Sequence, residues 1–128
     1  MTPEAMQTLI IRYFTATRAM DLDAWLACFA DDAISHDPYG APPIQGKGEL
    51  RKFFLSVATA FREIGFVEDF VIVTGNRAAV KFTSRGIGAN GKTAICEGID
   101  VFEVNDLGAI QTMWGYWDPA AMMAQLQG

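Results

Sequence analysis

The chain has only two cysteines, Cys28 and Cys96, and a single histidine, His36, among its 128 residues. Both cysteines lie in apolar segments, so we expect reduced core thiols, no disulfide and a cytoplasmic protein. One histidine without a CxxC or HExxH pattern leaves no recognisable transition-metal site. A glycine-rich phosphate-binding fingerprint is also missing. These absences point away from metal-dependent and phosphate-binding classes.

Long apolar runs and an excess of basic residues are missing as well. The apolar segments are far too short for a membrane span, and we expect no signal segment at the start of the chain. A formal net charge of −5 provides no basic stripe, which argues against a nucleic-acid partner. Hydrophobic residues make up 51% of the chain, as in a globular protein. Without a linker or an internal repeat, residues 1–128 are predicted to form one domain.

The pattern of apolar residues predicts helices first and strands afterwards. Thr2 and Pro3 are typical of a helix start, and helical spacing continues to about Met20; Asp21 then caps a short second helix. The other expected elements are a strand over 33–36, a helix over 47–62, strands over 66–74, 78–87, 92–104 and 109–117, and a short helix from residue 119. This order predicts an α+β fold. We expect a cone-shaped barrel in which a curved antiparallel sheet wraps over three N-terminal helices and encloses a pocket.

Asp100 lies in the middle of an otherwise apolar strand. Alternation places it on the same side as Cys96, Phe102 and Val104, where an ionised carboxylate is very costly unless it is paired. A carboxyl group in such a place has a raised pKa, stays protonated and can donate a hydrogen bond to a developing oxyanion. The structural alternative is that Asp100 pairs with a buried arginine or with backbone amides.

Two further polar residues stand out, each with a structural and a functional interpretation. Tyr13 shares the apolar stripe of the first helix, and its hydroxyl needs a partner: either a backbone carbonyl or a group in the pocket. Asp37 precedes Pro38, which keeps the chain extended there. Asp37 is either a turn-forming residue or a partly buried general base. Alternation directs His36 to the opposite face from Asp37.

These residues carry a resemblance that extends over nearly the whole chain. The conjunction of Tyr13, Asp37-Pro38 with Gly40, and Ile99-Asp100 resembles the Δ5-3-ketosteroid isomerases of the nuclear-transport-factor-2-like (SnoaL-like) superfamily. Further matching stretches are 29–33, 37–46, and 108–117, which occur in the order and at the spacing of that family. The phrase FADDA at 29–33 is common across the superfamily and weakly specific.

The resemblance implies a role for each residue. Asp37 matches the general base that carries a proton between two carbons of the steroid, Tyr13 the phenolic oxyanion donor, and Asp100 the protonated carboxyl donor. The positions that line the apolar substrate slot in the family are matched by Phe53, Met113 and Trp117. The implied enzyme is a cofactor-independent isomerase that acts on a small apolar ketone or steroid-like substrate, and the family points to a homodimer.

Two departures from the family pattern concern the surroundings of these groups. Phe54 stands where family enzymes commonly have a tyrosine that hydrogen-bonds the oxyanion tyrosine, so the network behind Tyr13 is expected to be shorter. His36 stands where family members tend to have glutamate, directly before the base.

Other functions of the same fold stay open at this point. A polyketide cyclase could use Asp100 as its acid–base group. Dehydratases of this fold need a histidine pair, and only His36 is present; epoxide hydrolases use an Asp-Arg-Asp set, for which Arg85 is a conceivable arginine. A non-catalytic ligand-binding module is a further alternative, because fold does not decide function.

Overall fold

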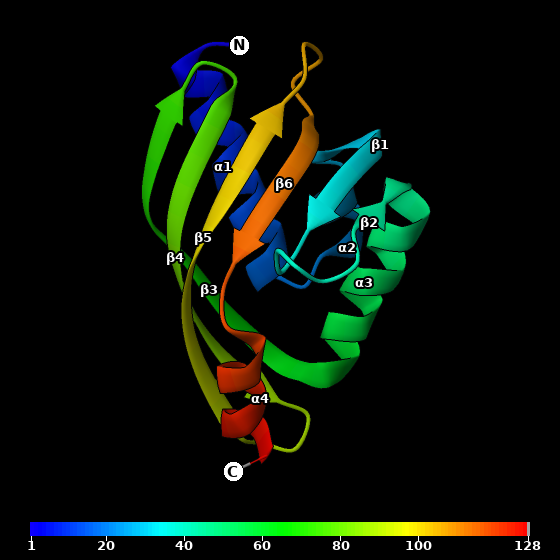
Figure 1. The fold of residues 1–128 in the computed structure, drawn as a ribbon, viewed down its shortest axis with the longest axis vertical. Coiled ribbons are helices and arrows are strands. Elements are labelled where there is room, and N and C mark those ends of the chain that lie inside the picture. Colours follow the sequence, from blue (N-terminus) through cyan, green and yellow to red (C-terminus); the bar gives the residue numbers. More distant parts are fainter. Residues whose placement is uncertain (128) are drawn as a thin grey trace.

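Six strands form a single curved sheet, and the helices of the N-terminal half pack on its concave face (Figure 1). The computed structural model describes residues 1–127. In chain order the elements are α1 (Pro3–Arg18), α2 (Leu22–Leu26), β1 (Phe29–His36), β2 (Ile44–Gln45), α3 (Gly46–Ala60), β3 (Phe61–Thr74), β4 (Arg77–Gly88), β5 (Thr93–Val104), β6 (Ile110–Tyr116) and α4 (Pro119–Gln127). This is the predicted α+β fold.

The strand order is β2-β1-β6-β5-β4-β3, and it corrects one feature of the predicted sheet. Strands β3 to β6 form the expected antiparallel meander, but β1 lies parallel to β6, so the sheet is mixed. The sheet is also open, because β2 and β3 form two separate edges. A parallel pair joins segments that are distant in sequence, here residues 29–36 and 110–114, and no local pattern reports such a pairing.

Local sequence explains where the first two helices begin. The side chain of Thr2 accepts a hydrogen bond from the Ala5 amide at 3.1 Å, and Asp21 does the same for Ala24 at 3.1 Å. Such caps satisfy amides that have no partner inside the helix. The stripe that includes Met6, Ile10 and Phe14 is fully buried against the sheet.

Two boundaries differ from those expected. β1 begins at Phe29 rather than at residue 33, and β3 begins at Phe61, directly after α3, rather than at residue 66. Phe61 already has extended backbone angles and pairs with Gly88. β3 is therefore long enough to bend around the lower end of α3, and Phe61 and Ile64 lie in the wall of the cavity described below.

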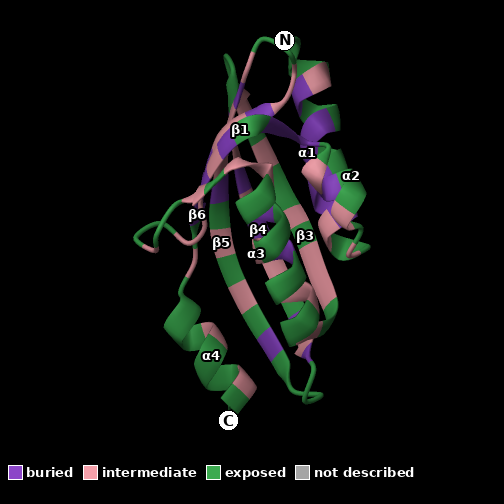
Figure 2. Ribbon diagram, turned by 90° about the vertical axis from the view of Figure 1, so that its right-hand side faces the viewer, coloured by how far each residue is buried: buried purple, intermediate pink, exposed green. Residues whose placement is uncertain are grey.

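The terminal helix α4 completes the lower part of the molecule, where β5 extends beyond the end of β6 (Figure 1). The Gln125 side chain accepts a hydrogen bond from the Ile95 amide at 2.7 Å and donates one to the Ile95 carbonyl at 2.8 Å. Gln125 thus occupies backbone groups of β5 that β6 does not reach. α4 itself stays largely exposed (Figure 2). Among the described residues, no helix combines the length and the apolar composition that a membrane span requires.

Candidate active site

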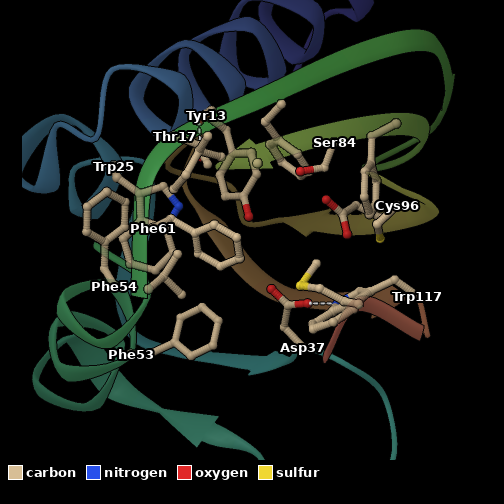
Figure 3. A pocket seen from close by; sticks show the side chains of 17 residues that line it. Tyr13, Thr17, Trp25, Asp37, Phe53, Phe54, Phe61, Ser84, Cys96 and Trp117 are labelled. Atoms are coloured by element: carbon tan, nitrogen blue, oxygen red, sulfur yellow. Dashed lines mark hydrogen bonds between the residues drawn. The ribbon is translucent and has the colours of Figure 1, made fainter. Parts of the chain in front are cut away.

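A cavity lies between the helices and the concave face of the sheet (Figure 3). Most of its wall is aromatic and aliphatic, with side chains from α3, β3 and β4, and Met122 of α4 lines its lower part. Tyr13, Asp37 and Asp100 all line this cavity. Three residues that are far apart in the sequence therefore meet at one apolar pocket, which is the usual composition of a small-molecule site.

Asp100 reaches the cavity from the middle of the sheet. It pairs with Val80 of β4 and Gly115 of β6, and only 2% of its surface is exposed. None of the ion pairs or side-chain hydrogen bonds formed within residues 1–127 includes Asp100, so the structural alternative of a buried arginine partner finds no support. Burial, and next the nearby charge of Asp37, raise the pKa of Asp100 well above its ordinary value.

Asp37 approaches from the end of β1 and is held by the last strand. The Trp117 indole donates a hydrogen bond from Nε1 to Asp37 Oδ1 at 2.6 Å, and the Tyr39 amide donates one to the Gly115 carbonyl at 2.8 Å. Burial raises the pKa of Asp37, and the Trp117 hydrogen bond opposes that rise. The carboxylate form is thus favoured at Asp37 relative to Asp100.

The two carboxyl groups are therefore differentiated. Like charges in one poorly solvated site do not both ionise readily, and the Asp37 charge further raises the pKa of Asp100. Asp37 has an indole N–H to stabilise its charge, whereas Asp100 has no comparable donor among the described side chains. The pair is suited to act as one ionised carboxylate and one neutral carboxylic acid.

Tyr13 projects from α1 into the same space. Its residue surface is 4% exposed, and its hydroxyl donates to the sulfur of Met113 at a long 3.8 Å. Burial, followed by the charges of Asp100 and Asp37, raises the pKa of Tyr13 well above its usual value of 10.0. The hydroxyl thus stays protonated, and the Met113 sulfur is only a weak acceptor for it.

Gly115 forms the floor between the two carboxyl groups. A methyl group at this position would lie 2.5 Å from Asp37 Oδ1 and 3.2 Å from Asp100 Oδ1. The first distance is shorter than any ordinary contact, so only glycine leaves room for Asp37 in its present place. The absence of a side chain at 115 therefore sets how closely the two carboxyls approach the sheet and each other.

Substituting Gly115 by alanine should displace the Asp37 carboxylate and break its hydrogen bond with Trp117. The Trp117 indole N–H signal in a ¹⁵N–¹H spectrum should then shift and exchange faster with water, and overpacking should destabilise the fold by about 1–3 kcal/mol. Gly48→Ala is the matched control, since nothing lies within 4 Å of a side chain there. An unchanged Trp117 signal in Gly115→Ala would contradict this account of the floor.

The three predicted substrate-contacting residues have different locations. Phe53 and Trp117 line the cavity, whereas Met113 is fully buried beside the Tyr13 hydroxyl and is not among the described residues that line it. His36 lies on the other face of the sheet, where its ring stacks on Trp114 with centroids 6.2 Å apart. Met113 thus contacts the Tyr13 hydroxyl through its sulfur.

Three contributors were not predicted from the sequence: Trp25, Phe61 and Gly115. Trp25 and Phe61 line the cavity but belong to apolar patterns that look like ordinary core. Gly115 carried one usable signal, because a glycine inside a strand often marks a close approach of other atoms.

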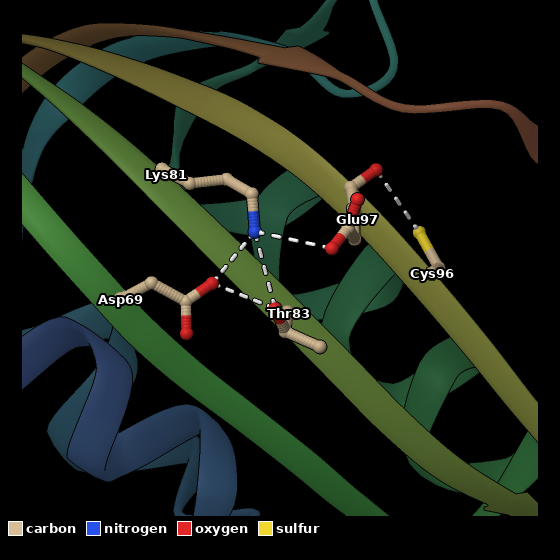
Figure 4. Close-up of polar contacts among 5 residues, drawn as sticks. All are labelled: Asp69, Lys81, Thr83, Cys96 and Glu97. Carbon is tan, nitrogen blue, oxygen red and sulfur yellow. Dashed lines mark hydrogen bonds and ion pairs between the residues drawn. The ribbon is translucent and has the colours of Figure 1, made fainter.

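A group of charged residues lies on the convex face of the sheet, away from the cavity. Lys81 contacts Asp69 at 2.7 Å, Thr83 at 3.2 Å and Glu97 at 3.6 Å (Figure 4). Arg85 follows the same alternation along β4 and is exposed, on the side opposite to the cavity-lining Ser84. Among the described residues, the cavity wall has no arginine or lysine. Within residues 1–127 there is also no group of three or more His, Cys, Asp or Glu side chains arranged to hold a metal ion.

A mixed, strongly curved sheet that covers helices around a carboxylate-bearing cavity defines a class of small-molecule-binding domains. The chain matches the SnoaL-like domain family over residues 10–113 and belongs to that family.

Two solved structures resemble this chain closely in fold. One is of SalBIII, described as an epoxide hydrolase/cyclase-like enzyme with a role in pyran ring formation in the polyether salinomycin; it is 23% identical, with a TM-score of 0.83 over 92% of this chain and 94% of that one. The other is RV0760c from Mycobacterium tuberculosis, 24% identical, with a TM-score of 0.83 over 94% of this chain and 96% of that one. At these identities the likeness establishes the fold.

Proposed function

We propose that the protein is a steroid Δ-isomerase, which moves the double bond of a 3-oxo-Δ5-steroid into conjugation with the ketone. The observation that carries this proposal is the convergence of Tyr13, Asp37 and Asp100 at one apolar cavity. It is supported by the opposite preferences of the two carboxyls for their proton, and by the resemblance of these three positions to ketosteroid isomerases. No cofactor or metal takes part in the proposed reaction.

The reaction consists of two proton transfers through one base. The Asp37 carboxylate removes a proton from C4 of the steroid, and the electron pair of that C–H bond moves towards the ketone to form a dienolate. Tyr13 and protonated Asp100 each donate a hydrogen bond to the oxygen as negative charge develops there. Protonated Asp37 then returns its proton to C6, which restores the ketone and leaves the new double bond at Δ4.

The wall of the cavity suits an apolar, flat substrate. Phe53 and Trp117 offer ring surfaces on either side of Asp37, and most of the surrounding wall is apolar (Figure 3). A dry site strengthens the two hydrogen bonds to the oxyanion relative to water. Met113, which the resemblance assigns to the substrate slot, acts in this proposal as the resting acceptor of the Tyr13 hydroxyl.

An absorbance assay tests the proposal directly. Purified protein is mixed with a Δ5-3-ketosteroid, and formation of the conjugated Δ4 isomer is followed in the ultraviolet. We expect turnover that depends on protein concentration and is lost in a variant without Asp37. Turnover no faster than that of buffer alone, from protein shown to be folded, would reject the steroid assignment.

A second candidate function is epoxide opening or cyclisation. One observation favours it: an ionised and a neutral carboxyl in one cavity can deprotonate a hydroxyl or water and protonate an epoxide oxygen. SalBIII, which has this fold, is described as epoxide hydrolase/cyclase-like. The Asp-Arg-Asp form of this chemistry is disfavoured, because Arg85 lies on the convex face. Incubation with a hydroxy-epoxide and analysis by mass spectrometry and chromatography separate this candidate from the isomerase and from a module that only binds.

We also propose that two copies associate through the convex face. Several large apolar side chains are exposed there, including Phe70 (57%), Ile72 (59%) and Tyr116 (47%), which is more apolar surface than a monomer usually leaves in water. Light scattering at micromolar concentration should therefore give twice the chain mass of 14.0 kDa. A species of 14.0 kDa alone would contradict the dimer.

Both cysteines are free, which supports a reducing compartment such as the cytoplasm.

A further inference from the structure

Trp25 of α2 is a buried side chain that the proposed reaction has not used. Its ring is packed between Phe29 and Phe54, with centroids 4.7 Å and 4.9 Å away, and only 3% of the residue is exposed. The same ring lines the cavity, and its centroid lies 6.3 Å from that of Tyr13 (Figure 3). Packing on two sides holds the indole in one orientation.

The indole N–H needs a hydrogen-bond acceptor. An indole can only donate, and buried indoles usually find a partner. Within the described residues no buried side-chain nitrogen or oxygen lacks a hydrogen-bond partner, and the Trp25 nitrogen faces the cavity (Figure 3). The acceptor available to it is the Tyr13 oxygen: a side-chain hydrogen bond from Trp25 lowers the pKa of that phenol, against the larger effect of burial.

The Tyr13 hydroxyl is itself weakly engaged. It donates to the Met113 sulfur at 3.8 Å, a poor acceptor that a ketone or enolate oxygen would easily replace. When the O–H turns towards such an oxygen, a lone pair of the phenol remains to accept a bond from another donor. Hydrogen bonds of active sites are often long in the unliganded protein and tighten in the complex.

We infer that Trp25 is a positioning residue: its indole N–H donates to the Tyr13 oxygen while the Tyr13 hydroxyl donates to the bound ligand. A bond accepted by the phenol polarises its O–H and makes it a stronger donor. It also restricts rotation of the hydroxyl, so that the proton points into the cavity. This inference rests on the proposed function only in assigning a ketone as the natural ligand.

The inference also explains how Tyr13 is supported although Phe54 departs from the family pattern. The resemblance implies that the hydrogen-bond network behind Tyr13 is shorter here, because Phe54 stands where family enzymes commonly have a tyrosine. Trp25 packs directly on that phenylalanine and supplies an N–H from the neighbouring helix. Phe54 is then the surface that holds the indole.

Nuclear magnetic resonance tests the contact without any need for turnover. The protein has three tryptophans, so a ¹⁵N–¹H spectrum should have three indole signals, and Trp25→Phe identifies the one from residue 25. Saturation with 2-naphthol, a planar phenol, should move that signal downfield and slow its exchange with water. In Tyr13→Phe the same addition should leave it near its unliganded position.

The other two indoles serve as internal controls. Trp114 lies on the convex face beside His36, and Trp117 is bonded to Asp37, so neither should follow the Tyr13 substitution in the way Trp25 does. A Trp25 signal that responds to 2-naphthol equally with and without the Tyr13 hydroxyl would overturn the inference. Because this measurement depends on ligand binding alone, its result can be interpreted even if the isomerase assay shows no turnover.

Steady-state kinetics provides a second test of the role of Trp25. Trp25→Phe keeps an aromatic ring between Phe29 and Phe54 but removes the N–H, so kcat should fall roughly tenfold while KM changes little. Trp114→Phe makes the same chemical change on the convex face and should keep wild-type kinetics. A loss confined to KM in Trp25→Phe, or no loss at all, would mean that Trp25 is only part of the wall.

Discussion

Replacing Asp37 by asparagine should lower the isomerisation rate by about 10²–10⁴-fold, the usual contribution of a positioned general base. Asparagine keeps the size and shape of the side chain, and its carbonyl oxygen can still accept the hydrogen bond from Trp117 that Asp37 accepts now at 2.6 Å. It cannot accept the proton from C4. The change therefore removes the chemistry while leaving the packing in place, and kcat measured with the Δ5-3-ketosteroid reports it.

Binding and pH dependence distinguish this result from general damage. A planar steroid phenol should bind Asp37→Asn as well as or better than it binds the original protein, because Tyr13 and Asp100 are untouched and one negative charge is gone. In the wild type, burial raises the pKa of Asp37, so kcat/KM should fall as the pH is lowered through that raised pKa. The residual kcat/KM of Asp37→Asn should not show this decrease at low pH.

The neighbouring residue provides a matched control. His36→Asn introduces the same side chain one position earlier, on the opposite face of the sheet, and should leave the rate unchanged. Near-normal turnover by Asp37→Asn would end the assignment of Asp37 as the proton shuttle, even if the steroid phenol binds this variant as tightly as expected.

The element order and the buried polar groups could be predicted because each depends on a local pattern. Helical spacing revealed the stripe that includes Tyr13, and strand alternation predicted that Asp100 points to the same side as Phe102; the structure confirms both placements. These are periodicities of two and of 3.6 residues, which the sequence contains directly.

The features that were missed depend on contacts between distant segments. Whether β1 runs parallel to β6 is decided by how the chain returns after four intervening strands. Gly115 matters because Asp37, nearly eighty residues away, rests against it. Trp25 has the spacing of a core residue and is one; its role comes from the direction of a single N–H bond, which no periodicity encodes. Met113 was expected in the cavity wall, but its side chain is fully buried, with its sulfur beside the Tyr13 hydroxyl.

Asp100 should respond very differently to two substitutions. Asp100→Asn keeps a hydrogen-bond donor of similar size, so activity should fall only modestly. Asp100→Leu removes the donor and should weaken transition-state stabilisation by roughly 2.7–4 kcal/mol, the usual scale for one contact to an oxyanion. The measurement is kcat for both variants with the same ketosteroid.

Stability as a function of pH gives an independent readout of the protonated state. The folded pKa of Asp100 is raised well above its ordinary value of 3.8, so between these two pKa values the folded protein binds a proton that the unfolded chain has lost. The free energy of unfolding should therefore decrease as the pH rises from about 4 through the folded pKa. Asp100→Asn cannot titrate and should lose the Asp100 share of this slope, so at neutral pH it should be at least as stable as the wild type.

A purely structural role for Asp100 leads to the opposite set of results. If its negative charge held the sheet together, asparagine and leucine would both remove that charge, and both would destabilise the fold. Activity would then decrease in proportion to the folded fraction, equally in the two variants. We expect instead that kcat differs between the two variants, because catalysis uses the O–H of a neutral acid. Asp100→Asn should melt no lower than the wild type, because burial of the Asp100 carboxyl group destabilises the folded protein.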